Sequence, residues 1–189
     1  MVYIKTTEQD YVFTDIVEDS LISEKNKNKY LVQDNDFGLD LIGDSPVIYY
    51  APKWHFELPN KDLGYDPYNE DETLNEDILA ILPIYGYEHS GISINAGYNR
   101  YHCVWDSAQI GYAFITKDMA KQYGLETTST EKLEQTIINI TNEIDKVYRG
   151  EVYTVVCEYL DDDNTVIDYD ICGGFIGYEW ALEALKDEF

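Results

Sequence analysis

The chain has few basic residues. Its 189 residues include 13 lysines and arginines against 37 aspartates and glutamates, which gives a formal net charge of −24. A small soluble domain usually carries a net charge of magnitude about 2 to 8. A surface this negative repels nucleic acid and membranes and attracts basic clefts. The composition therefore predicts a basic partner protein and no direct contact with nucleic acid or membrane. The alternative is that the surface charge only keeps the protein soluble.

Cysteine and long apolar runs are also scarce. The three cysteines, Cys103, Cys157 and Cys172, are odd in number and widely spaced, which is typical of reduced thiols rather than a disulfide framework. No apolar run approaches the length that spans a bilayer, and the N-terminal residues lack the apolar segment of a secretory signal. We therefore expect a cytoplasmic protein.

Signatures of metal and nucleotide sites are missing as well. No two of the three histidines have zinc-ligand spacing. The run Asp161–Asp163 has Val166 at the sixth position, where a calcium loop requires glycine. The glycines of 173–177 lack the spacing and the βαβ context of a dinucleotide loop. We expect no metal and no cofactor.

The negative charge is concentrated in two stretches without lysine or arginine, between Lys61 and Arg100 and between Arg149 and Lys186. Each stretch holds a dense acidic cluster, and a weaker third region is Asp34–Asp44. We expect these carboxylates to pair with lysines and arginines that otherwise meet phosphate. The predicted partner-binding residues are Asp66, Glu70, Asp71, Glu72, Glu76, Asp77, Asp161, Asp162, Asp163, Asp168 and Asp170.

Tyrosine is abundant, with 18 residues against six phenylalanines. A tyrosine buries a large ring while its hydroxyl stays in water, so it suits sheet faces and binding surfaces alike. Ring packing on a β-rich scaffold and a tyrosine-rich recognition face both fit this composition.

The residue pattern predicts an α+β fold, with a mixed or antiparallel sheet packed with two to three helices. Residues 1–77 form an irregular, strand-containing part with acidic loops, and 78–189 form an α+β part that makes one compact unit with the first. Apolar and β-branched runs predict strands over 2–5, 11–17, 46–50, 78–85, 92–95 and 108–116, and a hairpin over 151–160 and 165–171. Pro83 marks an edge or a bulge.

Helices are expected over 117–123, 129–149 and 178–186. Ser129 or Thr130 can cap the second helix, and Glu134 can neutralise its exposed amides. Glu24–Lys29 and 66–77 are expected to be loops, 86–91 a turn, and Gly173–Gly177 a bend between hairpin and helix.

The segment 101–112 concentrates reactive residue types. A cysteine nucleophile needs a nearby base and a third group that orients the base. Cys103, His102 and Asp106 are such a set, although sequence neighbours on a strand point to opposite faces; His55 or His89 can replace His102 as the base. The other interpretation is a packed turn that enters a core strand, with Asp106 and Ser107 bonded to the local backbone and Trp105 packed at the corner.

The same segment resembles a signature of acidic proteins of phages, plasmids and integrative elements. In that family the run reads Trp-Asp-Ser-Gly-Gln-x-Gly, and here it comprises Trp105, Asp106, Ser107, Gln109 and Gly111, with Ala108 in place of the first glycine. The resemblance covers about Glu88 to Trp180. It implies a mobile-element origin and, by analogy, an inhibitor of host defence such as an antirestriction or anti-CRISPR protein.

The charge and the resemblance predict a nucleic-acid mimic that blocks the basic cleft of a defence nuclease complex in the host cytoplasm, without catalysis. A hydrolase or transferase that uses Cys103, His102 and Asp106 is one alternative. An acidic module that binds a basic protein away from its nucleic-acid site is another. Whether the protein forms a homodimer stays open.

Overall fold

The structure is a computed structural model. It describes residues 2–5, 10–13, 16–34, 38–103 and 105–187, with side chains from residue 16 onward. These residues form two four-stranded antiparallel sheets, a two-stranded antiparallel sheet and three α-helices. The predicted α+β class is confirmed.

The chain divides into two compact units. The central unit is Leu39–Arg149, and the split unit joins Met1–Gly38 with Gly150–Phe189. The two ends of the chain belong together because strand β4 (Lys27–Gln33) pairs along its whole length with β9 (Val152–Leu160). The expected division between residues 77 and 78 coincides with neither boundary, and there are two compact units in place of one.

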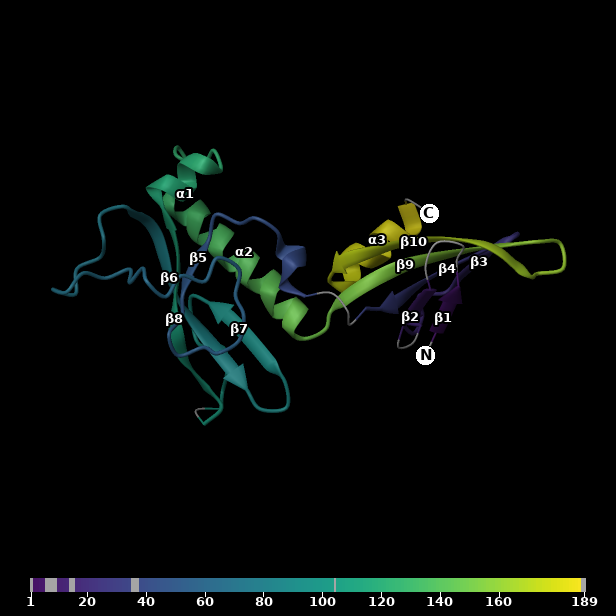
Figure 1. The fold of residues 1–189 in the computed structure, drawn as a ribbon, viewed down its shortest axis with the longest axis horizontal. Coiled ribbons are helices and arrows are strands. Elements are labelled where there is room, and N and C mark those ends of the chain that lie inside the picture. Colours follow the sequence, from purple (N-terminus) through teal and green to yellow (C-terminus); the bar gives the residue numbers. More distant parts are fainter. Residues whose placement is uncertain (1, 6–9, 14–15, 35–37, 104, 188–189) are drawn as a thin grey trace. The chain divides into compact units, whose positions relative to one another are not determined.

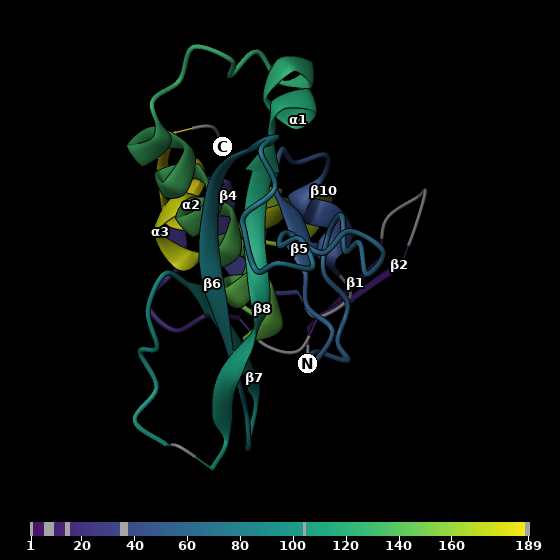
Figure 2. The same cartoon turned by 90° about the vertical axis from the view of Figure 1, so that its left-hand side faces the viewer.

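The central unit is built on a sheet with the strand order β5-β8-β6-β7 (Figures 1 and 2). Its strands are β5 (Ile48–Tyr50), β6 (Ile78–Glu88), β7 (Ile92–Ala96) and β8 (Ser107–Thr116). Helix α2 (Thr130–Tyr148) packs its apolar stripe into the same core as the strands. Leu133 and Ile137 of the helix share that core with Ala113 and Ile115 of β8. The helix predicted over 129–149 is confirmed.

The two helices of this unit have different N-terminal caps. Helix α1 (Lys117–Gln122) follows Thr116, whose hydroxyl accepts a hydrogen bond from the Met119 N–H at 3.2 Å. At α2 the N-cap residue is Ser129, but its side chain makes no capping bond. Glu131, rather than the expected Glu134, bonds to the helix backbone. This bond and one with Ser129 hold the pKa of Glu131 below its usual range.

Pro83 lies in a central strand, at a position that needs no N–H donor. Its carbonyl accepts the Gly97 N–H at 2.9 Å, just beyond the end of β7. In an antiparallel strand the N–H and C=O of one residue point to the same side, so the missing donor also faces the space past β7. A register shift follows between Ile84 and Tyr85, which agrees with the expected bulge.

The split unit contains a sheet with the strand order β10-β9-β4-β3, where β3 is Ile22–Glu24 and β10 is Val166–Ile176. Helix α3 (Tyr178–Asp187) packs against one face of this sheet (Figure 1). Ala181 and Leu185 of the helix form a core with Leu31 and Val155. The strands β1 (Val2–Lys5) and β2 (Asp10–Phe13) pair as a separate antiparallel hairpin.

Two segments expected to be irregular are largely strand, and one expected turn is shorter. Within Glu24–Lys29 only residues 25 and 26 form the turn of the β3–β4 hairpin, with Asn26 at a φ of 61°, a conformation that asparagine tolerates. Strand β10 continues through most of Gly173–Gly177 with a register shift between Cys172 and Phe175. Strand β6 extends to Glu88, so the expected turn over 86–91 is shorter. No helix of the described residues is long and apolar enough to span a membrane.

Candidate partner-binding surfaces

The first predicted acidic cluster belongs to residues 62–77, which we call the acidic loop. Tyr65 stacks on Phe114 of β8 with ring centroids 5.3 Å apart, and Tyr68 meets Tyr112 edge-on at 5.2 Å. Side chains alternate along a strand, so Phe114 and Tyr112 lie on the face opposite the one that packs against α2. Two tyrosines thus fix the acidic loop on the sheet.

Three of the loop carboxylates hold the loop itself in shape. Asp66 accepts the Tyr68 N–H at 3.0 Å, and Asp71 accepts the hydroxyl and the N–H of Thr73 at 2.5 and 3.1 Å. The bonds to Thr73 lower the pKa of Asp71. Asp77 accepts the hydroxyl of Tyr65 at 2.6 Å. Burial, followed by this bond, raises the pKa of Tyr65 to about 12.

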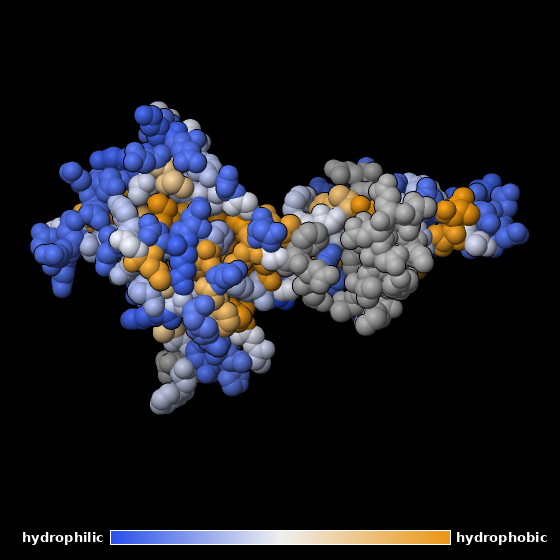
Figure 3. Space-filling view, viewed as in Figure 1, coloured by the Kyte–Doolittle hydropathy of each residue, from blue (hydrophilic) through white to orange (hydrophobic). Residues whose placement is uncertain are grey.

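The other three predicted carboxylates of the loop, Glu70, Glu72 and Glu76, are exposed. Within the described residues, none of their side chains has an ion-pair or hydrogen-bond partner, and no lysine or arginine pairs with any carboxylate of the loop. Figure 3 shows hydrophilic residues gathered over this part of the central unit. The acidic loop therefore presents unneutralised charge on a fixed backbone.

The second predicted cluster begins at the tip of the β9–β10 hairpin. Asp161 accepts the N–H groups of Asp163 and Thr165 at 2.9 and 2.8 Å, and Asn164 takes a φ of 59° to close the turn. Asp161 therefore shapes the turn, while Asp162 and Asp163 are exposed.

The remaining residues of this cluster, Asp168 and Asp170, lie on β10, in the sheet that also holds Lys27 of β4. The pairing register places Lys27, Tyr159 and Asp168 in one row across three strands. Lys27 lies over the Tyr159 ring, with Nζ 5.3 Å from its centroid. The Tyr159 hydroxyl donates to Asp170 at 2.5 Å, and this bond raises the pKa of Tyr159. Lys27 thus shares a row with Asp168, and the Asp170 carboxylate already accepts a bond from Tyr159, which makes these two aspartates weaker candidates than the acidic loop.

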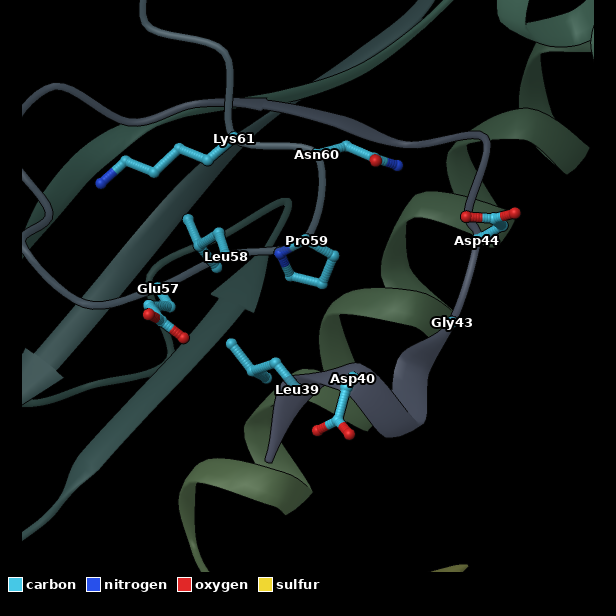
Figure 4. A pocket seen from close by; sticks show the side chains of 9 residues that line it. All are labelled: Leu39, Asp40, Gly43, Asp44, Glu57, Leu58, Pro59, Asn60 and Lys61. Atoms are coloured by element: carbon cyan, nitrogen blue, oxygen red, sulfur yellow. The ribbon is translucent and has the colours of Figure 1, made fainter. Parts of the chain in front are cut away.

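The third region, Asp34–Asp44, is only partly a surface. Asp34 is buried and accepts the Thr154 hydroxyl at 2.9 Å, so the expectation of partner contact is wrong for this residue: it is held inside the split unit. Residues 35–37 lie outside the described residues. Asp40 and Asp44 are exposed, and both line a cavity of about 550 Å³ next to the 3-10 helix Leu39–Ile42 (Figure 4).

The motif residues Trp105 and Asp106 each bring a correction. Trp105 is 92% exposed, so it does not pack at the corner as expected. Ser107 makes the expected backbone bond, to the Cys103 carbonyl at 2.6 Å, but the Asp106 carboxylate accepts the Cys103 thiol at 3.0 Å rather than a backbone group. Gln109 is exposed. Gly111 lies where a Cβ atom would come within 2.0 Å of the Tyr50 carbonyl oxygen, so only glycine lets β8 and β5 approach this closely.

The residues of the alternative enzymatic function, Cys103, His102 and Asp106, are not arranged as a catalytic triad. Cys103 donates to the Asp106 carboxylate at 3.0 Å, and Nδ1 of His89 lies 3.6 Å from the same oxygen. No bond joins His102 to Cys103 in the described residues. A triad needs the base between the thiol and the orienting acid, whereas here the carboxylate lies between the thiol and the imidazole.

The sequence did not reveal a buried ion network at the free edge of β7. Asp145 of α2 has a side chain that is 2% exposed and contacts Arg100 at 2.5 Å and Arg149 at 3.2 Å. It also accepts the Ile94 N–H at 2.8 Å and the Ser93 hydroxyl at 2.5 Å. Arg100 donates to the Ile94 carbonyl at 3.4 Å.

This network satisfies both edge groups of Ile94, which would otherwise be open to pairing with another strand. One signal was available in the sequence. Thr141 and Asp145 stand at positions of α2 that the helical spacing assigns to the buried stripe, and both are buried. A polar residue at such a position needs a partner.

Within the described residues, no group of three or more histidine, cysteine, aspartate or glutamate side chains could hold a metal ion. Comparison with protein-family models, with curated proteins and with solved structures finds no match for this chain. Its function is therefore inferred from its own residues.

Proposed function

We propose that the protein is an acidic nucleic-acid mimic that inhibits a host-defence nuclease complex, either a CRISPR effector or a restriction enzyme. It occupies the basic cleft that normally receives DNA or RNA. The observation that supports this proposal is the acidic loop, whose exposed Glu70, Glu72 and Glu76 have no cationic partner among the described residues.

The physical basis is a match of charge patterns. Duplex DNA carries one negative charge per about 1.7 Å of its axis, and proteins that bind it neutralise several of its phosphates with lysines and arginines. Closely spaced carboxylates on a fixed loop offer those side chains the same partners. The exposed Asp162 and Asp163 of the hairpin tip add a second contact. The long-range field accelerates association and makes it sensitive to salt.

This mode of action needs no bond to be broken, because occupying the cleft is enough to exclude nucleic acid. It places the protein in the cytoplasm of the host cell, where such complexes act. Each single ion pair at a rim is worth little, so inhibition depends on several carboxylates acting together.

The experiment compares two triple variants with the same change of net charge. Glu70→Lys, Glu72→Lys and Glu76→Lys reverse the loop, while Glu126→Lys, Glu143→Lys and Glu183→Lys reverse exposed glutamates elsewhere. Each variant is expressed in cells that carry a restriction or CRISPR system, and the plaque-forming efficiency of a targeted phage is measured.

We expect the loop variant to lose protection of the phage and the control to retain most of it. Equal protection by both variants would contradict the proposal. Equal loss would show that net charge matters and the loop does not. An acidic module that binds away from the nucleic-acid site predicts that nucleic acid and the protein bind the same partner together.

A further inference from the structure

The edge of the central sheet is covered on β7 and on β5 but not along the whole of β8. On β7 both backbone groups of Ile94 are bonded to side chains. On β5 the Tyr49 N–H donates to the Asn60 carbonyl at 3.3 Å, and the Tyr49 carbonyl accepts the Asp62 N–H at 3.0 Å. Strand β5 pairs only with residues 112–114 of β8. In the part of the chain that the structure describes, no strand pairs with the first half of β8 on that side.

Ser107 and Gln109 direct their backbone groups toward this open edge. Residues of an antiparallel pair alternate between facing the partner strand and facing away from it. The Glu88 N–H donates to the Asp106 carbonyl at 3.0 Å, so Asp106 faces β6 and Ser107, the next residue, faces away. Gln109 lies two residues further along and pairs with Tyr85 in the register, so it faces away as well. Within the described residues, neither the N–H nor the carbonyl of Ser107 or Gln109 has a partner on that side.

A groove follows the open edge. Two hollows of about 310 and 300 Å³ lie along β8, and because both are lined by Lys53 and Ile110 they are continuous. Ile110 and Trp54 belong to the core of the central unit, so the lining of the groove is fixed by the fold. Trp105, which is 92% exposed, lines one hollow. We call this feature, formed mainly by residues 50–55 and 105–112, the β8 groove.

The two ends of the β8 groove differ in chemistry. Glu88 and Asp106 line the hollow that Trp105 also lines, whereas Tyr50 and Tyr112 line the other hollow. A basic side chain suits the first end, where carboxylates lie beside an indole ring, and an apolar side chain suits the second. Tryptophan is enriched among the residues that dominate the binding energy of interfaces.

We propose that an extended segment of the partner protein pairs with β8 at Ser107 and Gln109, antiparallel to β8 and in continuation of β5. Strand addition at a sheet edge takes its affinity from main-chain hydrogen bonds and its specificity from hollows that receive side chains. That the segment is basic rests on the proposed function. A second copy of this chain is disfavoured as the occupant, because each copy has a net charge of −24 and like charges repel.

The test uses the full chain labelled with ¹⁵N and the probe peptide acetyl-Lys-Val-Arg-Val-Lys-amide, followed by NMR. We expect saturable shifts at the amides of 105–112 and slower hydrogen exchange at the N–H groups of Ser107 and Gln109, because strand pairing protects them. The matched acidic peptide, with glutamate in place of each basic residue, should not bind.

Two N-methylated forms of the peptide separate strand pairing from charge. One carries methyl groups on the amides of both valines and the other on the amides of the arginine and the last lysine. Alternate amides of a strand face opposite sides, so we expect one form to lose binding and the other to keep it. Equal affinity of the two forms would show that charge alone holds the peptide and would overturn the proposal.

A pair of variants tests the edge from the side of the protein. Gln109→Pro removes an N–H that faces away from β6, which a sheet edge tolerates, and it should weaken the peptide about tenfold, since the peptide carbonyl is left without a donor. Gln109→Ala keeps the backbone and should leave the affinity unaltered. If circular dichroism shows that Gln109→Pro does not fold, the two methylated peptides decide the question.

Shifts confined to the acidic loop, no saturable binding, or a dimer of the free chain that protects Ser107 and Gln109 would each overturn the proposal. It fails separately from the proposed function. If the peptide does not bind but the loop reversal still abolishes protection of the phage, only the added strand is wrong. If the peptide binds as expected and the loop reversal has no effect, only the proposed mimicry is wrong.

Discussion

Asp145 contributes more to the stability of the fold than any single carboxylate on the surface. Replacing it by alanine leaves Arg100 without its buried partner and leaves the Ile94 N–H unsatisfied at the edge of β7. The side chains of Arg100 and Arg149 are 35% and 46% exposed and stay partly solvated, so the main loss is the unsatisfied N–H of Ile94, which typically costs about 1–3 kcal/mol. We expect Asp145→Ala to lower the free energy of unfolding by this order, measured by denaturant titration. The matched control is Glu143→Ala, an exposed change on the same helix; identical unfolding midpoints for the two variants would contradict the structure.

Cys103 separates the proposed inhibitor from the enzymatic alternative. Its thiol donates to the Asp106 carboxylate, and within the described residues no histidine lies between the thiol and that carboxylate to act as a base. We expect Cys103→Ser to protect a phage as well as the unmodified protein does, because serine keeps the donor to Asp106 and only a nucleophile would be lost. Loss of protection by a variant that still folds, judged by circular dichroism, would favour the enzyme.

At the residue scale, local hydrogen bonds were predictable from the sequence, whereas the exposure and packing of single side chains were not. The bond of Ser107 to the nearby backbone was predictable because hydroxyls bond locally in turns. The exposure of Trp105 was not, because an indole ring is usually buried and only the path of 103–107 decides otherwise. The need for Gly111 follows from the approach of β5, which depends on strand pairing and not on the local sequence.

The acidic loop is attached to its sheet by tyrosines, and this attachment depends on pH. Tyr65 is uncharged when it donates to Asp77, and its pKa is raised to about 12 from an ordinary value of 10. Its contribution to stability is therefore complete below pH 10 and is lost as the pH rises towards 12.

We expect the unfolding free energy of the unmodified protein to fall more steeply between pH 10 and pH 12 than that of Tyr65→Phe, which keeps the ring contact with Phe114 but has no hydroxyl to titrate. Chemical denaturation at several pH values measures the two slopes. Parallel slopes would show that the bond from Tyr65 to Asp77 does not contribute.

At the element scale, long periodic or apolar runs were predictable and polar strands were not. The apolar stripe of α2 and the β-branched runs of β6 and β8 were predictable, because burial of one face repeats apolar residues at a regular spacing in the sequence. Strand β4 begins Lys27-Asn28-Lys29, a composition typical of loops, and it forms because β9 supplies its partner. The acidic loop was predictable as irregular from its glycine, proline and charge, but which tyrosines hold it depends on the register of β8.

At the scale of the whole molecule, the pairing of the two chain ends decides the division into units. Such a contact joins residues more than a hundred positions apart, and no local pattern encodes it. The charge distribution was predictable as a total but not as a surface. Lys27 lies in the same row as Asp168 across the sheet, and Asp34 is buried. The glutamates of the acidic loop pair with no cation among the described residues. The acidic loop is therefore the main candidate for contact with a basic cleft.

The most direct measurement is a competition between this protein and nucleic acid for one partner. The partner is captured from host-cell extract on the immobilised protein and then exposed to increasing duplex DNA or RNA at several salt concentrations. The account predicts that nucleic acid releases the partner, that no ternary complex forms, and that binding of the partner weakens steeply with salt. A stable ternary complex, or binding that is indifferent to salt, would contradict it.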